Sequence, residues 1–87
     1  MNFDKVIFWC QNYGRADVED KRAVKEFVDI ESDETVKPFL VQLHTIAEGR
    51  YDEELLDKQI GIKRRAKYGT YAEWAKLMLR WIHEPGT

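Results

Sequence analysis

The chain has 87 residues, of which 44% are hydrophobic and 34% are charged, so it can bury one small core and is too apolar to be disordered. It has no run of 18 apolar residues that could span a bilayer, and its single cysteine, Cys10, cannot form an intramolecular disulfide. Because the chain is this short, we expect one domain, residues 1–87. The first residues lack the basic and long apolar regions of a secretory signal, so we expect the protein in the cytoplasm.

Apolar residues recur at helical spacing along nearly the whole chain, and glycine and aspartate residues interrupt them. This pattern predicts an all-α fold, a compact bundle of four to five short helices. We expect the helices at about 2–13, 17–31, 33–48, 52–68 and 70–83. The short turns between them favour antiparallel neighbours.

The first two expected helices each have an apolar face. The first begins at an Asn2 cap and ends before Gly14. Its apolar stripe consists of Phe3, Val6, Ile7, Cys10 and Tyr13. In the second helix, we expect Ile30 to face the core and Asp20 to face water.

The third and fourth expected helices each contain a residue that disfavours helix. The third begins near Ser32 or Asp33, and Pro38 would kink it if it began at the earlier residue. The fourth begins at Asp52, and Gly61 interrupts it at a cost of about 1 kcal/mol relative to alanine. One long helix and two shorter helices are therefore both open alternatives for this segment.

The last expected helix has the clearest signals. Thr70 and Glu73 have the spacing of a capping box, and Pro85 ends the helical pattern. The polar stripe is narrow, so the helix is either the central element of the bundle or a core helix with one apolar face left for a partner. We favour the central element. In the other case, the candidate partner surface consists of Trp74, Leu77, Leu79 and Trp81.

The charge of the chain changes sign along the sequence. Residues 1–57 contain 14 Asp and Glu against seven Lys and Arg, whereas residues 58–87 contain two against seven. The candidate anion-binding residues of the basic part are Lys63, Arg64, Arg65, Lys67, Lys76 and Arg80. We favour ordinary helix electrostatics as the explanation of this pattern, because acidic residues at the start and basic residues at the end stabilise the helix dipole.

The acidic segment 17–34 also allows two interpretations. It contains eight Asp and Glu residues, which could attract a basic protein or a second copy of the chain. We favour the simpler interpretation, in which these side chains form the solvated face of the second helix.

The residues that usually carry catalysis or bind metals are few and scattered. His44, His83 and Cys10 do not have the spacing of metal ligands, and Ser32, the only serine, lacks the motif of an activated nucleophile. The glycines are isolated, so no loop is built to bind phosphate. We therefore expect no enzyme, no cofactor and no metal.

These patterns predict a small, non-catalytic protein-interaction module whose partner is another protein or a second copy of the chain. The alternative function is the binding of nucleic acid or another polyanion through the basic 58–80 segment. A membrane partner is not expected. No motif in the sequence decides between the first two functions.

Overall fold

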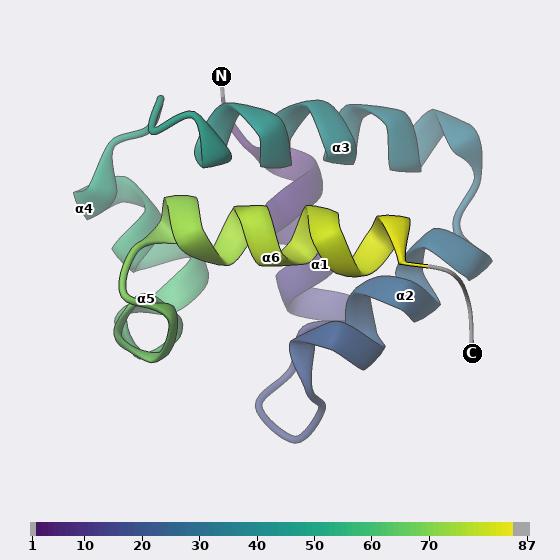
Figure 1. Cartoon of the computed structure of the whole chain (residues 1–87), viewed down its shortest axis with the longest axis horizontal. Helices are drawn as coiled ribbons and strands as arrows, with labels where there is room; N and C mark the ends of the chain where they lie inside the picture. Colours follow the sequence, from purple (N-terminus) through teal and green to yellow (C-terminus); the bar gives the residue numbers. More distant parts are fainter. Residues whose placement is uncertain (1, 85–87) are drawn as a thin grey trace.

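The protein is an assembly of short helices, shown in Figure 1 by a computed structural model that describes residues 2–84. The elements are α1 (Asp4–Asn12), α2 (Asp20–Ile30), α3 (Asp33–Ala47), α4 (Glu53–Leu56), a π-helix η1 (Asp57–Gly61), α5 (Ile62–Tyr68) and α6 (Tyr71–His83). No strand occurs within 2–84, which confirms the predicted all-α fold. Pro85, expected to end the last helix, lies outside the described residues.

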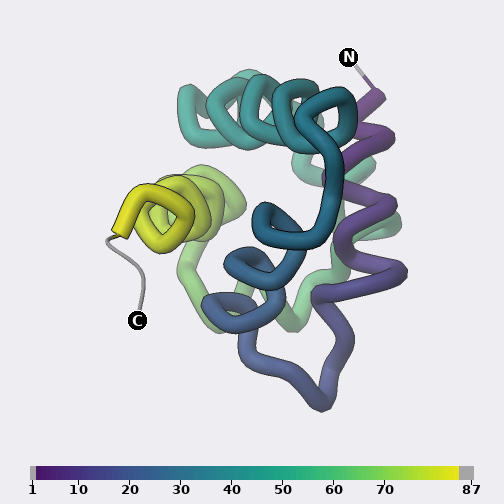
Figure 2. Tube along the Cα trace, turned by 90° about the vertical axis from the view of Figure 1, so that its right-hand side faces the viewer, coloured from purple at the N-terminus to yellow at the C-terminus, as the bar shows by residue number. Residues whose placement is uncertain are grey.

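The helices α3 and α6 pack against each other more extensively than any other pair of helices within 2–84. They lie side by side and run in opposite directions, while α1 crosses behind them (Figure 1). Figure 2 shows α3 and α6 nearly end-on, with α1 upright beside them. Because α6 also packs against α2 and α5, the interpretation of this helix as the central element is confirmed.

Aromatic side chains from four helices form the core. Trp9 of α1, Phe27 of α2, Phe39 of α3 and Trp74 of α6 are all fully buried. The ring centroids of Phe27 and Phe39 lie 4.5 Å apart, and those of Trp9 and Trp74 lie 6.0 Å apart. Burying side chains of this size stabilises the fold by about 1.5–3 kcal/mol each, so this cluster is a main source of stability.

Two predicted helix starts are confirmed by their side-chain caps. Asp52 Oδ1 accepts hydrogen bonds from the amides of Glu54 and Leu55, at 3.0 and 3.3 Å. Thr70 Oγ1 accepts one from the amide of Glu73 at 3.0 Å. These bonds satisfy amides that have no acceptor within the helix.

The first turn of α1 is capped from another helix. Gln42 of α3 is buried, and its Oε1 accepts hydrogen bonds from the amides of Lys5 and Val6 at 3.0 and 3.1 Å. Its Nε2 donates to Asp4 Oδ1 at 2.8 Å. A side chain distant in sequence therefore completes the start of α1.

The boundary and the faces of the second helix differ from the prediction. The helix begins at Asp20 and not near residue 17, because Glu19 has an extended backbone. Asp20, expected in water, is only 6% exposed, whereas Ile30, expected in the core, is 61% exposed. On α1, Trp9 is fully buried although it was not in the predicted stripe.

The segment predicted as one helix over 52–68 or as two shorter ones is interrupted. It consists of α4, the π-helix η1 and α5, and the φ angle of Gly61 is 115°. Residues with a side chain rarely adopt this φ, so glycine allows the chain to change direction here. The alternative of shorter helices is therefore correct.

Membrane insertion has no support in the helices that the structure describes. None of those within 2–84 combines the length and the apolar character needed to cross a bilayer.

Gly14 provides a test of the packing around Trp9 in the core. A Cβ atom on Gly14 would lie 2.4 Å from Cζ3 of Trp9, a ring that is fully buried and has little room to move. We expect Gly14→Ala to lower the free energy of unfolding by about 1–3 kcal/mol in urea titrations. Ala16→Ser, in the same loop but exposed, is the control, and equal stabilities of the two variants would contradict this packing.

Candidate functional site

Arg64, a predicted anion-binding residue, faces the interior of the protein. Its Nε and Nη2 donate to the two carboxylate oxygens of Asp20 at 2.9 and 3.0 Å, and Nη2 also donates to the carbonyl of Gly14 at 2.8 Å. The guanidinium carbon lies 5.3 Å from the ring centroid of Trp9 and 5.8 Å from that of Trp74. Only 15% of the Arg64 side chain is exposed, so it serves the core and not an external anion.

The carboxylate of Asp20 joins α2 to α5 and α6. Besides Arg64, its Oδ2 accepts hydrogen bonds from the hydroxyl of Tyr68 at 3.1 Å and from Nε1 of Trp74 at 3.2 Å. Burial acts to lower the pKa of Arg64, but the hydrogen bonds to Asp20 and the electrostatic attraction of the surrounding groups, Asp20 among them, together outweigh it and raise the pKa. Burial also raises the pKa of the nearby Cys10 thiol to about 11, so this thiol is protonated and unreactive near neutral pH.

Arg65, the next candidate, is also occupied within the chain. Its Nε and Nη2 donate to the carboxylate of Asp57 at 2.9 and 3.1 Å, and Nη1 lies 3.0 Å from Glu53. The hydroxyl of Tyr71 donates to Asp57 Oδ1 at 2.7 Å. The hydrogen bonds from Tyr71 and from Arg65 together hold the pKa of Asp57 below its ordinary value. This network ties α4, η1, α5 and α6 together.

The remaining candidate cations are exposed but do not share one site. Lys63 and Lys67 line a groove of about 580 Å³ with Arg15, which comes from the loop between α1 and α2. Neither Lys76 nor Arg80 of α6 is among the residues that line it. Lys76 is paired instead with Glu73 on its own helix, at 3.6 Å. The structure thus adds Arg15, which lies in the acidic half of the sequence and was not predicted.

The four residues of the candidate partner surface also differ in how far they are buried. Trp74 and Leu79 are buried, so they belong to the core and cannot form a partner surface. Leu77 and Trp81 are partly exposed. Trp81 stacks edge-on against Tyr68, with ring centroids 6.4 Å apart, which fixes its indole at the surface.

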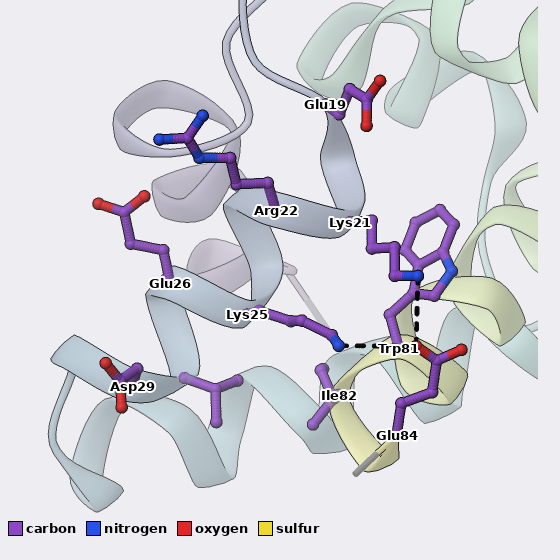
Figure 3. A pocket seen from close by; sticks show the side chains of 10 residues that line it. Glu19, Lys21, Arg22, Lys25, Glu26, Asp29, Trp81, Ile82 and Glu84 are labelled. Atoms are coloured by element: carbon purple, nitrogen blue, oxygen red, sulfur yellow. Dashed lines mark ion pairs between the residues drawn. The ribbon is translucent and has the colours of Figure 1, made fainter. Parts of the chain in front are cut away.

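Trp81 lies in a second, larger groove of about 810 Å³ between α2 and the end of α6, the α2–α6 groove (Figure 3). Its apolar lining consists of Val28, Trp81 and Ile82. Its charged lining consists of Glu19, Lys21, Arg22, Lys25, Glu26, Asp29 and Glu84. Of this apolar lining, only Trp81 belongs to the partner surface predicted from the sequence.

A single carboxylate holds two lysines at one side of the α2–α6 groove. Glu84 Oε2 lies 3.4 Å from Nζ of Lys21 and 3.6 Å from Nζ of Lys25. Figure 3 shows both lysines converging on Glu84 beside Trp81, whereas Arg22 and Glu26 extend to the other side. The apolar residues Val28, Trp81 and Ile82 form the floor of the groove. Next to this floor, two lysine ammonium groups share one carboxylate.

No metal centre is assembled within residues 2–84, because nowhere do three or more His, Cys, Asp or Glu side chains come together in a suitable arrangement. The absence of catalytic activity stays a prediction.

Comparisons of the chain with protein-family models, with curated proteins and with solved structures gave no match. The function must therefore be inferred from the residues of the grooves themselves.

The pair of Asp20 and Arg64 can be tested by stability. Asp20→Asn keeps the side-chain shape but leaves the guanidinium buried without a counter-charge, which typically costs about 3–5 kcal/mol. We expect a loss near the lower end of this range in urea unfolding, because 15% of Arg64 is exposed. Asp17→Asn, an exposed residue of the preceding loop, should change the stability by less than about 0.5 kcal/mol. A similar small effect of Asp20→Asn would contradict the role of this pair.

Tyr68 makes the stability sensitive to alkaline pH. Burial and the neighbouring Asp20 raise its pKa from 10 to about 12. The unfolded chain then loses the phenolic proton first, so the stabilisation is complete below pH 10 and is lost as the pH rises towards 12. We expect the free energy of unfolding of Tyr68→Phe to fall less steeply over this interval than that of the wild type. Parallel curves for the two proteins would show that Tyr68 does not titrate in this way.

Proposed function

We propose that the protein is a non-catalytic protein-interaction module that binds a short segment of a partner protein in the α2–α6 groove. The observation that carries this proposal is the apolar floor of Val28, Trp81 and Ile82, left partly exposed between charged side chains. Protein interfaces commonly combine an apolar centre with a polar rim in this way. We place this activity in the cytoplasm.

The side chains of the floor suit such a partner. Tryptophan contributes more binding energy than most residues at interfaces, because it buries a large, rigid surface at low entropic cost. The indole of Trp81 is already held against Tyr68, so binding does not need to order it. A partner segment with one or two large apolar side chains would cover Trp81 and Ile82.

Anion binding is the second candidate function, and one observation supports it. The loop after α1 brings Arg15 to the groove that Lys63 and Lys67 line, so three exposed cations face one space. Nucleic-acid binding usually needs more phosphate contacts than three cations can make, and no aromatic side chain lines this groove for base stacking. We therefore place this function second.

The second candidate is tested with single- and double-stranded oligonucleotides at about 50 and 200 mM salt by fluorescence anisotropy. Polyanion binding predicts affinity that falls steeply with salt and is lost in the triple variant Arg15→Gln/Lys63→Gln/Lys67→Gln. An absence of binding at the lower salt concentration would eliminate it.

The first proposal is tested by selecting short random peptides displayed on phage against the whole protein. We expect enriched peptides that bind the wild type and bind Trp81→Ala at least about tenfold more weakly, since Trp81 would be the central contact. Val41→Ala, at an exposed apolar residue of α3 that does not line this groove, should bind them like the wild type. Far-UV circular dichroism checks that each variant is folded. If nothing is enriched, or if Trp81→Ala binds unchanged, the proposal is wrong.

A further inference from the structure

On its charged side, the α2–α6 groove contains the carboxylate of Glu84, a residue of the same chain at the end of α6. Lys21 and Lys25 lie four residues apart on α2, so both ammonium groups reach the same side of the helix. Glu84 directly follows the last residue of α6, and its extended backbone places its carboxylate between these two groups. Although partial burial acts to raise the pKa of Glu84, the two lysines outweigh it and lower the pKa, so the carboxylate is charged near neutral pH.

The position of Glu84 indicates which chemical group of a partner this part of the groove can bind. We propose that the α2–α6 groove selects partner segments in which an acidic residue stands next to large apolar residues, and that Glu84 occupies the acid's position until the partner displaces it. This inference rests on the proposed function, and it specifies the partner's chemistry. In the partner, the apolar side chains cover Trp81 and Ile82, and the carboxylate takes the place of Glu84 between Lys21 and Lys25.

The exchange of one carboxylate for another explains what the charges can contribute. Glu84 is partly exposed and Lys21 is half exposed, so their ion pair is weak and releasing it costs little. The incoming carboxylate regains the same interactions. The net affinity therefore comes from the apolar floor, and the lysines determine which segments are accepted.

The other charges of the groove make this selection directional. Glu19, Glu26 and Asp29 also line the groove, and they repel a carboxylate placed near them. Glu26 and Asp29 lie across the groove from Glu84 in Figure 3. Arg22 is the single cation on that side, against Glu26 and Asp29, so the lysine side attracts a carboxylate more strongly and would orient an acidic segment along the groove.

The test uses the same displayed peptide library, selected in parallel against three forms of the whole protein. The forms are the wild type, Lys21→Gln/Lys25→Gln, and a matched control, Lys37→Gln/Lys58→Gln, whose lysines are exposed and do not line this groove. We expect peptides enriched on the wild type and on the control to contain Asp or Glu beside aromatic or aliphatic residues. On Lys21→Gln/Lys25→Gln, we expect the apolar residues to be kept and the acidic preference to be lost.

A single substitution tests the role of Glu84 itself. Glu84→Gln removes the competing charge, so a synthetic acidic peptide from the wild-type selection should bind it about threefold to fivefold more tightly in an anisotropy titration. The same peptide with Asp or Glu replaced by Asn or Gln should bind the wild type and Glu84→Gln equally. A purely structural ion pair would leave both affinities unchanged.

The outcomes separate this inference from the proposed function. If wild-type selection enriches apolar peptides without an acidic residue, the module is retained and the inference about the partner is overturned. If Glu84→Gln binds the acidic peptide no more tightly than the wild type, Glu84 does not occupy the acid's position. If no form of the protein enriches any peptide, the proposed function itself fails.

Discussion

The buried pair of Arg64 and Asp20 joins α5 to α2, and its hydrogen bonds extend to α6 and to the loop after α1. Asp20 is the first residue of α2, Arg64 lies in the middle of α5, and their network includes the indole of Trp74 on α6 and the carbonyl of Gly14 after α1. A charge in the interior is costly unless its partner and all its hydrogen-bonding groups are satisfied. The positions of these four segments are therefore interdependent, and α2 starts where its first carboxylate can reach the guanidinium.

Ion pairing within the fold also explains why part of the basic stretch is not available at the surface. The side chains of Arg64 and Arg65 turn inward to Asp20 and Asp57, which come from the acidic half of the chain. The charge asymmetry along the sequence is thus partly cancelled in space by pairing within the fold. What the surface retains is a dispersed set of lysines and two grooves with different linings.

Local signals predicted most of the fold, and long-range contacts account for the errors. Helix periodicity and the caps at Asp52 and Thr70 involve neighbours in sequence, so they could be recognised. The burial of Asp20 depends on Arg64, 44 residues away, and nothing near an aspartate at a helix start distinguishes a buried carboxylate from a solvated one. The grooves were missed for the same reason, because Lys21 meets Glu84 and Arg15 meets Lys63 only in the folded chain. Of the candidate partner surface, only Trp81 lies in a groove, since burial depends on neighbouring helices and not on the pattern of one helix.

The cap that Gln42 places on α1 has a consequence for the order in which the protein folds. A helix of nine residues is too short to persist by itself in water, and the amides of Lys5 and Val6 in its first turn find their acceptor on α3. The fold therefore gains α1 only when the chain has closed a loop of more than thirty residues, between Lys5 and Gln42. By contrast, α3 has fifteen residues and α6 carries its own Thr70 cap, so these two helices can form early and offer the surface on which α1 condenses.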